Sequence, residues 1–271
     1  MFDLLNKVVV ITGGAGLLGI QHARALAEYG ATTVLLDINE QGVVQAARDI
    51  DEAFDAPCVG LAVDITDEGQ VEACAKRVLD MFGHIDSLIN NAANNPKVED
   101  GLGGASSRLE NFSLAQWNQD LAVGLTGAFL CAKHFGAIIA EGKNGGTIIN
   151  ISSDLGVIAP DQRLYSAEGV ADAEQEVKPV TYSVTKSGII GLTRYMATYW
   201  AERNVRSNAL CFGGVETNQP EAFLNRVRDR IPMGRMARPD EYSGTIVFMV
   251  SDDAEYMNGS IISMDGGRSA W

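Results

Sequence analysis

Short apolar runs rich in β-branched residues alternate with longer segments of helical periodicity along nearly the whole chain. Most of these runs are almost continuously hydrophobic, as expected for strands that are buried on both faces of a parallel sheet. Strand–helix alternation implies right-handed crossovers, so the pattern predicts an α/β fold with a doubly wound sheet of about seven parallel strands and helices on both faces. The predicted strands are Val8–Thr12, Thr33–Asp37, Cys58–Val63, Ser87–Asn90, Thr147–Ile151, Arg206–Leu210 and Ser260–Met264.

The helical segments lie between these strands, and no linker, internal repeat or low-complexity tract interrupts the series. A chain of 271 residues is long enough for one large domain, so we expect residues 1–271 to form a single unit. The predicted helices are Leu18–Tyr29, Glu40–Phe54, Asp67–Phe82, Leu114–Ile139, Thr181–Glu202 and Asp240–Ser251.

The charge and cysteine content restrict the kinds of partner. The chain carries 35 acidic against 21 basic residues, and its net charge of −14 argues against nucleic acids and anionic membranes, which require a basic surface. Its cysteines are widely spaced, without a C-x-x-C pair or a nearby histidine, so neither a metal site nor a disulfide framework is expected. We find no signal-peptide pattern and no apolar run expected to span a bilayer, and we therefore expect a cytoplasmic protein.

A glycine-rich turn, TGGAGLLG at Thr12–Gly19, joins the first predicted strand to the first predicted helix. Glycines allow a tight turn here and let backbone N–H groups approach a pyrophosphate at the positive end of the helix. This strand–turn–helix context is the one that a dinucleotide-binding site requires. The backbone contacts are expected from Gly13, Gly16, Leu17, Leu18 and Gly19.

Asp37 ends the second predicted strand, where a carboxylate would accept hydrogen bonds from the adenosine ribose hydroxyls. The same charge would repel a 2′-phosphate, and no Arg or Lys lies in the glycine-rich turn or in the first residues after Asp37 to offset it. The sequence therefore favours NAD over NADP. Asp64–Ile65 and Asn91–Ala92, after the third and fourth strands, are further candidates to line the adenine and ribose, although each pair fits equally well as loop-capping residues.

Tyr182 and Lys186 are spaced as Y-x-x-x-K in a predicted helix, so their side chains share one helix face. A phenol ordinarily ionises near pH ~10, and a neighbouring ammonium favours the phenolate. Such a tyrosine is suited to exchange a proton with a substrate hydroxyl or carbonyl. Because tyrosine and lysine also occur at this spacing by chance, the pair gains its weight from the rest of the chain.

In combination these motifs resemble those of the short-chain dehydrogenase/reductase family, nearly from end to end. The resemblance implies a Rossmann-type fold, a nicotinamide cofactor, and hydride transfer between a secondary alcohol and a ketone. In this reading Ser153 polarises the substrate oxygen, Tyr182 donates or accepts the proton, and Lys186 holds the nicotinamide ribose and lowers the pKa of the tyrosine. The motifs are TGGAGLLG at Thr12–Gly19, Asp64, NNAA at Asn90–Ala93, NISS at Asn150–Ser153, YSVTK at Tyr182–Lys186, RSNALCFGGVET at Arg206–Thr217 and MDGG at Met264–Gly267.

The chain departs from the family pattern at three positions. Leu17 replaces the second glycine of the turn, which shifts the details of the pyrophosphate approach. Gly124 stands where the family has an asparagine that helps to hold a water of the proton relay, so the relay must use other groups or bulk solvent. Phe212 stands where a proline is usual, and we expect it to reshape the wall of the nicotinamide pocket. The family's remaining cofactor contacts, to the nicotinamide carboxamide and the pyrophosphate, fall on Gly213, Val215 and Thr217.

The segment 154–180 is longer than in ordinary family members, and we interpret it as a substrate-side insertion that closes over the site. A solvated surface loop is the alternative. Polar residues here and in 94–110 favour a small polar substrate over a steroid or fatty acyl chain. The turn, Gly124 and the insertion together resemble oxidoreductases of flagellin-modification gene clusters, which serve nonulosonate-sugar synthesis, so a sugar or sugar phosphate is expected. Candidate phosphate contacts are Lys97, Arg108, Arg163 and Lys178.

Two other functions remain open. The first is a 3-oxoacyl-thioester reductase, against which the acidic insertion counts because anionic carriers favour a basic entrance. The second is a low-activity NAD-binding regulatory protein, which Gly124 favours and the complete set of Ser153, Tyr182 and Lys186 opposes. Family members usually form homodimers or homotetramers through their long fifth and sixth helices, so by analogy we expect a homo-oligomer.

Overall fold

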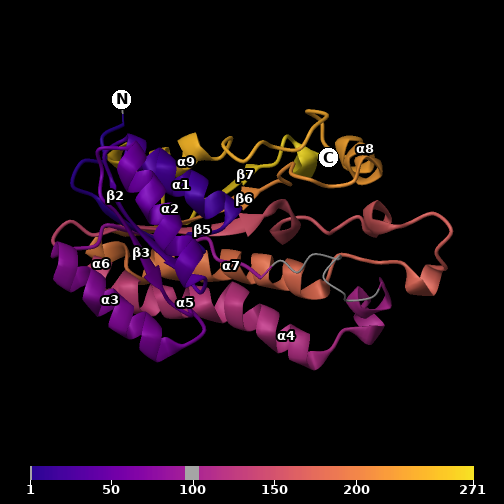
Figure 1. Ribbon diagram of the computed structural model, residues 1–271, viewed down its shortest axis with the longest axis horizontal. Helices are drawn as coiled ribbons and strands as arrows, with labels where there is room; N and C mark the ends of the chain where they lie inside the picture. Colours follow the sequence, from indigo (N-terminus) through magenta and orange to yellow (C-terminus); the bar gives the residue numbers. More distant parts are fainter. Residues whose placement is uncertain (1, 95–103) are drawn as a thin grey trace.

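The structure, a computed structural model, describes residues 2–94 and 104–271 of the chain. Its centre is a seven-stranded parallel sheet with the strand order β3-β2-β1-β4-β5-β6-β7 (Figure 1). The winding reverses between β1 and β4, because the chain builds the sheet first to one side of β1 and then to the other. The predicted doubly wound α/β fold is confirmed. The strands are β1 Val8–Thr12, β2 Thr32–Asp37, β3 Cys58–Ala62, β4 Ser87–Asn90, β5 Gly146–Ser153, β6 Val205–Phe212 and β7 Ile261–Met264.

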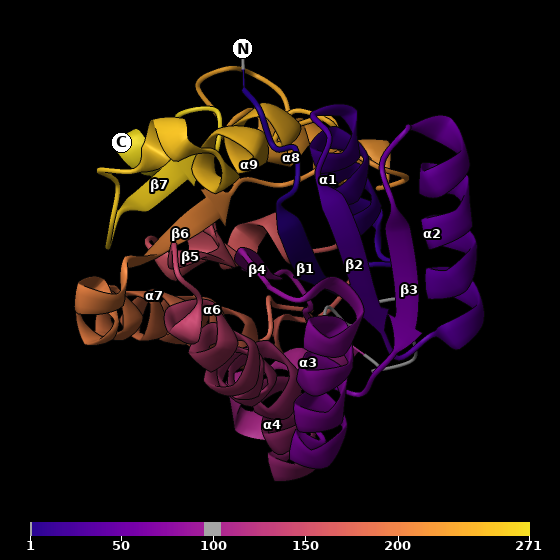
Figure 2. The ribbon, with the colours of Figure 1, turned by 90° about the vertical axis from the view of Figure 1, so that its left-hand side faces the viewer.

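Helices cover both faces of the sheet (Figure 2). Helices α1, α2 and α9 enclose one apolar core, whereas α3, α4–α6 and α7 enclose the other. Neighbouring residues of one strand contribute to opposite cores, as Val10 and Ile11 do in β1, because strand side chains alternate between faces. The helices are α1 Leu17–Glu28, α2 Glu40–Ala53, α3 Glu68–Phe82, α4 Leu114–Leu121, α5 Ala128–Cys131, α6 Ala137–Glu141, α7 Val180–Tyr199, α8 Glu221–Arg228 and α9 Ser243–Val250.

Helices α4, α5 and α6 are joined by the π-helical segments Ala122–Gly127 and Ala132–Gly136, so they form the single long helix that the sequence predicts. By length and composition the stretch Leu114–Glu141 is apolar enough to cross a membrane, with a mean hydropathy of 1.5 in its most apolar window. This corrects the expectation that the chain has no such run. The hydropathy has a structural cause, because Phe135 and Ile139 are fully buried in the core formed with α3 and the sheet.

Helix α8, which has eight residues of which half are polar, is absent from the helices predicted from the sequence. The helix is held in place by Leu224 and Val227, which pack with Leu164 of the 154–180 insertion in a small separate core. Contact with a segment far away in the sequence, rather than local periodicity, therefore stabilises α8.

His22 is a buried polar side chain on α1, in the core between α1 and the sheet. Its ring lies 5.8 Å from that of Phe212, and neither ring nitrogen has a hydrogen-bond partner among the residues that the structure describes. Burial lowers the pKa of His22 from 6.5 to about 4, because an imidazolium ion is poorly solvated in the core.

We expect this histidine to make the fold acid-sensitive. Below pH 6.5 the histidine of the unfolded chain binds a proton, whereas His22 of the folded chain does not. The contribution of neutral His22 to the free energy of unfolding is therefore fully present above pH 6.5 and is lost as the pH falls toward 4. Between pH 7 and pH 5 the free energy of unfolding should fall by about 2 kcal/mol through this residue. In His22→Leu this component should vanish, as measured by urea unfolding at both pH values. Equal pH dependence of the two proteins would contradict this account.

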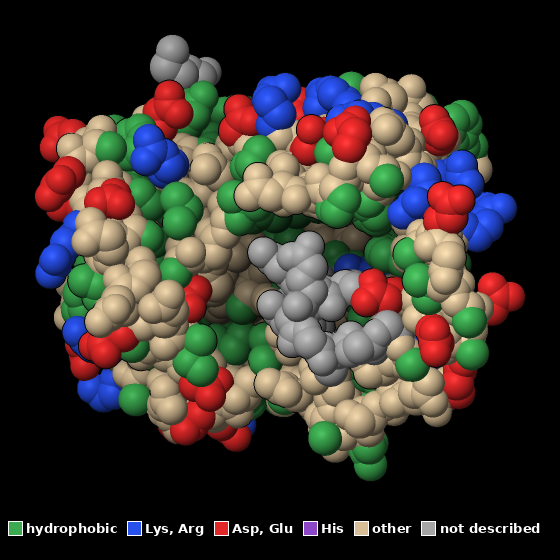
Figure 3. Space-filling model, turned by 45° about the vertical axis from the view of Figure 1, so that its right-hand side comes forward, with side chains coloured by type: hydrophobic (Ala, Val, Ile, Leu, Met, Phe, Trp, Pro, Cys, Tyr) green, Lys and Arg blue, Asp and Glu red, His purple; other side chains and the backbone are tan. Residues whose placement is uncertain are grey.

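The carboxyl ends of the parallel strands meet at one edge of the sheet, where open α/β folds bind ligands. The insertion and the 104–110 segment both lie there and touch each other. The backbone N–H of Val177 donates to Ser107 Oγ over 3.0 Å, and Arg108 Nη1 donates to the carbonyl of Asp172 over 2.8 Å. Figure 3 shows this side of the molecule hollowed, with hydrophobic, acidic and basic side chains near the rim.

Candidate active site

Strand β5 and helix α7 are tied together so that the predicted catalytic side chains converge. Ser152 Oγ donates to the carbonyl of Lys186 over 2.8 Å, and Lys186 Nζ donates to the carbonyl of Ile151 over 2.9 Å. Ser153 is the last residue of β5, and Tyr182 lies in the first turn of α7. The structure thus brings Ser153, Tyr182 and Lys186 into one site at the carboxyl edge of a central strand.

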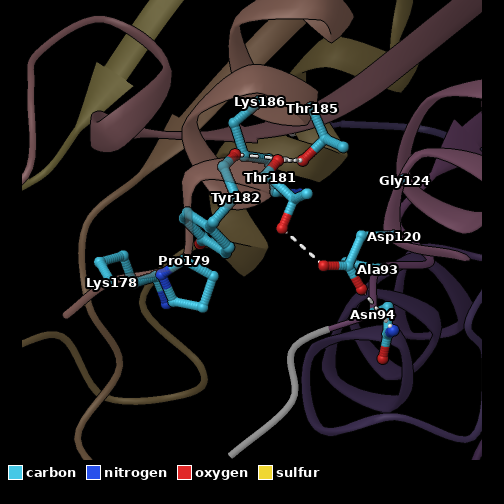
Figure 4. Close-up of a pocket in the computed structure, with 10 residues that line it drawn as sticks. All are labelled: Ala93, Asn94, Asp120, Gly124, Lys178, Pro179, Thr181, Tyr182, Thr185 and Lys186. Atoms are coloured by element: carbon cyan, nitrogen blue, oxygen red, sulfur yellow. Dashed lines mark hydrogen bonds between the residues drawn. The ribbon is translucent and has the colours of Figure 1, made fainter. Parts of the chain in front are cut away.

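The direction of the pKa shift of Tyr182 differs from the expectation, and Figure 4 shows the residues around its side chain. Burial raises the pKa of its phenol, and a hydrogen bond with Ser153 acts in the opposite direction. Lys186 Nζ is 6.0 Å from the centre of the ring and its ammonium is engaged by the carbonyl of Ile151. In the protein by itself, desolvation therefore outweighs the pKa-lowering effect that the family resemblance assigns to Lys186.

A second lysine, Lys178 of the insertion, lies closer to the tyrosine ring, with its Nζ 3.8 Å from the ring centre. Burial lowers the pKa of Lys178 to about 8, and burial together with the charge of Lys178 lowers the pKa of Lys186 to about 8. Both amines line the same pocket as Tyr182. Two amines with lowered pKa values, rather than one, therefore lie beside Tyr182.

The pocket beside Tyr182 encloses about 20 Å³, which is enough for one water molecule. Its opposite wall carries Asp120, a buried carboxylate from α4. Asp120 accepts hydrogen bonds from Thr181 Oγ1, from Asn94 Nδ2 over 2.8 Å and from Gln116 Nε2 over 2.7 Å. This carboxylate, which the motifs did not point to, fixes the residue next to Tyr182 and hence the start of α7.

Gly124 lines the same pocket, and Thr185 fills the space beside it. A Cβ at position 124 would lie 3.1 Å from Thr185 Cγ2, closer than most side chains allow. The Thr185 hydroxyl in turn donates to the carbonyl of Thr181 over 2.8 Å. An asparagine at position 124 would thus require Thr185 to move, so this departure from the family is matched by a packed neighbour.

The glycine-rich turn forms a cradle that only glycine can form. Gly13 has a φ of +65°, and a Cβ there would lie 2.9 Å from Ala92 Cα. A Cβ on Gly19 would lie 2.2 Å from the carbonyl oxygen of Gly13. Helix α1 begins at Leu17 after Gly16, and the first amides of a helix lack partners within the helix. The turn therefore fits the pyrophosphate of a dinucleotide.

Asp37 lies beside this cradle at the end of β2. Its Oδ2 accepts a hydrogen bond from the N–H of Ala15 over 3.1 Å, and its Oδ1 accepts one from Asn39 over 3.0 Å. The carboxylate is half-buried and is held at the mouth of the turn. Its position fits a contact with the ribose of a nucleotide seated on α1.

The other predicted lining residues are already engaged by contacts within the protein. Asn91 Nδ2 donates to the carbonyl of Thr12 over 2.9 Å, and Asp64 Oδ1 accepts from both the N–H and the hydroxyl of Thr66. Ile65 is buried in the core beneath α3 and α5. The loop-capping alternative thus describes the side chain of Asp64, whereas the amide of Asn91 ties the end of β4 to the glycine-rich turn, where it also donates to the carbonyl of Gly13 over 3.2 Å.

Phe212 does not form a pocket wall, contrary to expectation. It is 4% exposed and stacks on Tyr242 in the core, with ring centres 3.8 Å apart. The hydroxyl of Tyr242 donates to the carbonyl of Gly213 over 2.9 Å. Because the aromatic pair lies behind the strand end, it fixes the backbone of Gly213 rather than reshaping the surface toward a ligand.

The segment after Gly213 folds back on itself through Gln219. The Gln219 side chain donates to the carbonyl of Val215 over 2.9 Å and accepts from the N–H of Thr217 over 2.7 Å. Val215 also forms an isolated parallel bridge with Ala237. Val215 and Thr217 are thus held at the carboxyl edge of β6, on the side of the sheet where a nicotinamide is expected.

The insertion is anchored at its first half and exposed at its tip. Leu164 is buried against α8, and Arg230 Nε donates to Asp161 Oδ2 over 3.0 Å. Residues 167–174 are exposed. Among the candidate phosphate contacts, Arg163 is paired with Asp161 and Arg108 with Glu110, whereas Lys97 lies outside the described residues.

Two charged residues beside Ser153 were missed by the sequence reasoning. Asp154 follows it directly, and Arg268 reaches the site from the C-terminal end of the chain. Their Oδ2 and Nη1 atoms are 2.8 Å apart and both side chains are nearly buried. No spacing in the sequence could have indicated this pair.

The chain is similar to known proteins along nearly its whole length. Residues 15–269 match the family model described as enoyl-(acyl carrier protein) reductase. The chain is 34% identical to 2-dehydro-3-deoxy-D-gluconate 5-dehydrogenase of Escherichia coli, with 98% of this chain and 96% of that protein covered. It is 33% identical to cis-4-hydroxycyclohexanecarboxylate dehydrogenase of Sinomonas cyclohexanicum, with 98% and 97% covered.

A solved structure is also similar over the full length. Gluconate 5-dehydrogenase from Burkholderia cenocepacia, in complex with NADP and tartrate, superposes with a TM-score of 0.84 at 28% identity, covering 100% of this chain and 98% of that one. The fold, the family match and the convergence of Ser153, Tyr182 and Lys186 all point the same way. The chain belongs to the short-chain dehydrogenase/reductase family, whose members are oxidoreductases of alcohols and ketones.

Proposed function

We propose that this enzyme is an NAD-dependent oxidoreductase that interconverts a polar secondary alcohol and its ketone, with Ser153, Tyr182 and Lys186 as its catalytic residues. The observation that carries the proposal is the convergence of these side chains at the end of β5, next to a glycine cradle that fits a dinucleotide. Asp37 beside the cradle supports NAD as the cofactor, although the similar gluconate dehydrogenase was solved with NADP.

In this mechanism the hydroxyls of Ser153 and Tyr182 hold the substrate oxygen. During ketone reduction negative charge develops on that oxygen, and the two hydroxyls stabilise the charge as positioned donors. Tyr182 then donates its proton to the oxygen. In alcohol oxidation the Tyr182 phenolate accepts the proton of the substrate hydroxyl. A bound nicotinamide supplies or accepts the hydride. Lys186 is anchored at β5 by its bond to Ile151 and would also contact the nicotinamide ribose, which brings its charge toward the phenol.

A second cavity, whose lining does not include Ser153, Tyr182 or Lys186, supports a hydroxylated substrate. It has a volume of about 910 Å³ and lies between the 104–111 segment and the insertion. Its lining offers hydroxyl and amide groups together with the carboxylates of Glu174 and Glu176. Carboxylates disfavour a phosphate, and two of the candidate phosphate contacts, Arg108 and Arg163, are already in ion pairs. Within the expected sugar class, we therefore favour a sugar or polyol over a sugar phosphate.

A substrate screen tests this proposal. Polyols, sugars, sugar acids and sugar phosphates are incubated with NAD⁺ and with NADP⁺, and reduced cofactor is followed by its absorbance, with acetoacetyl thioester plus NADH as the competing substrate. We expect turnover of a hydroxylated substrate with NAD⁺, faster than of the thioester. Preferred turnover of the thioester would instead support the 3-oxoacyl reductase alternative. Binding of NADH without turnover of any compound would support a regulatory nucleotide binder.

We also propose that the protein is a cytoplasmic homodimer or homotetramer that associates through α4–α6 and α7. Large side chains on these helices are exposed, among them Phe129 at 49% and the stacked pair Tyr195 and Tyr199 at 62% each. We expect light scattering to give the mass of two or four chains. The double variant with Tyr195→Glu and Tyr199→Glu should have a lower mass in the same measurement. A monomer at micromolar concentration would contradict this proposal.

A further inference from the structure

The Ser153 hydroxyl donates its hydrogen bond to a carboxylate in this structure. Its Oγ donates to Asp154 Oδ1 over 2.7 Å, and the N–H of Leu155 donates to the same Oδ1 over 2.8 Å. A hydroxyl has one proton to donate, so the serine can meet the phenol of Tyr182 only as an acceptor. Asp154 thus decides which way the serine hydroxyl points.

Arg268 balances the charge of this carboxylate. Its Nη1 donates to Asp154 Oδ2 over 2.8 Å, and the exposed fractions of the two side chains are 12% and 3%. A buried carboxylate without a partner would hold the serine proton strongly, because charge-assisted hydrogen bonds are the stronger kind. Because the Arg268 guanidinium also donates to this carboxylate, it weakens the hydrogen bond from Ser153 to Asp154. The Ser153 hydroxyl can then rotate and donate its proton to a substrate oxygen.

The turn that follows β7 positions Arg268 at the site. Asp265, at the end of β7, accepts hydrogen bonds from the N–H groups of Gly267 and Ser269, both over 2.9 Å. Gly266 and Gly267 have φ values of +66° and +89°, which side chains rarely adopt. This turn brings Arg268 back to the end of β5, so the C-terminus of the chain completes the active site.

We propose that Asp154 and Arg268 act as a pair of positioning residues, which orient the Ser153 hydroxyl and set the balance of charge around Tyr182. The inference rests on the catalytic roles proposed above. It goes beyond them, because it assigns to the C-terminal turn a role in the reaction. Removing one member should leave the other as an uncompensated charge near the phenol, and the two removals should act in opposite directions.

The charges around Tyr182 come from several elements. Asp154 lies after β5, Arg268 lies after β7, and Asp120 of α4 lines the same pocket. Lys178 and Tyr165 belong to the insertion, and Lys186 lies one turn further along α7. Asp154 raises the pKa of Tyr182 and Arg268 lowers it. The same two charges act with the same signs on Lys178, which must therefore be separated from the tyrosine in the test.

The test is the pH dependence of kcat for alcohol oxidation, in which Tyr182 must accept a proton. Asp154→Asn leaves the charge of Arg268 unpaired, which favours the phenolate of Tyr182. The rising limb of the plot of kcat against pH should therefore shift by about one pH unit to lower pH. Arg268→Gln should shift it by a similar amount to higher pH. Arg268→Lys, which keeps the charge, should restore most of the wild-type profile, and the double variant should lie between the two single variants.

Controls separate this inference from a structural effect and from the proposed function. Glu241→Gln breaks another ion pair, with Arg235, and should leave the profile unchanged. The opposite shifts should persist in a Lys178→Met background, which assigns them to Tyr182. Equal losses of rate in both single variants without opposite shifts would overturn the positioning role. Failure of the proposed function appears separately, as unchanged turnover when Tyr182 itself is replaced by phenylalanine.

Discussion

Replacement of Tyr182 by phenylalanine should reduce kcat on the order of 10³-fold, because the variant keeps the ring but loses the proton that the reaction exchanges. The effect should fall on the chemical step. Binding of NADH should stay within about twofold of wild type, since the cofactor cradle lies on β1, β2 and α1 and the lost hydroxyl is only one contact at its nicotinamide end. Cofactor fluorescence titration and steady-state kinetics on the best substrate of the screen measure the two quantities.

Tyr195→Phe is the matched control, because Tyr195 lies on the same helix but is 62% exposed, away from the pocket. It should retain full activity. If Tyr182→Phe turned over as fast as the wild type, the assignment of Tyr182 as proton donor and acceptor would be wrong, whatever the behaviour of the neighbouring residues.

The second large effect should be on the choice of cofactor. Asp37→Ala removes the carboxylate that lies at the mouth of the glycine cradle, and with it the repulsion of a 2′-phosphate and the acceptor for the ribose hydroxyls. The ratio of kcat/KM for NAD to that for NADP should fall by roughly 10- to 100-fold, which corresponds to about 1.4–2.8 kcal/mol. Parallel kinetics with both cofactors measure this ratio.

Asp49→Ala removes one charge from the exposed face of α2 and should leave the cofactor ratio unchanged, so it separates local repulsion from net charge. A wild-type enzyme that used NADPH as well as NADH would show that the reading of Asp37 is incorrect. The similar structure solved with NADP makes this comparison informative.

The strands and most helices could be predicted from the sequence because their signals are local. Runs such as VVVIT in β1 are hydrophobic throughout, and a strand buried on both faces requires that composition. Glycines were informative for a similar reason, since the turn after β1 leaves no room for a side chain at Gly13 or Gly19. The convergence of Ser153 with Tyr182 was accessible only through the resemblance to a family, because the two residues lie on different elements.

Features that depend on contacts between distant segments were not predictable. The short helix α8 is stabilised by the packing of Leu224 and Val227 with Leu164 of the insertion. The engagement of Ser153 by Asp154 and Arg268 joins the ends of β5 and of the whole chain. The raised pKa of Tyr182 results from burial by the insertion and its neighbours, and no property of a Y-x-x-x-K motif reports burial.

The most direct test of the central claim is a crystal structure of the enzyme with NAD⁺ bound. We predict that the pyrophosphate lies over the turn at Gly13–Gly19 and that the Tyr182 hydroxyl faces the reactive carbon of the nicotinamide ring, with space for one substrate carbon between them. A Tyr182 hydroxyl directed away from that carbon, without a rotamer that brings it back, would contradict the assignment.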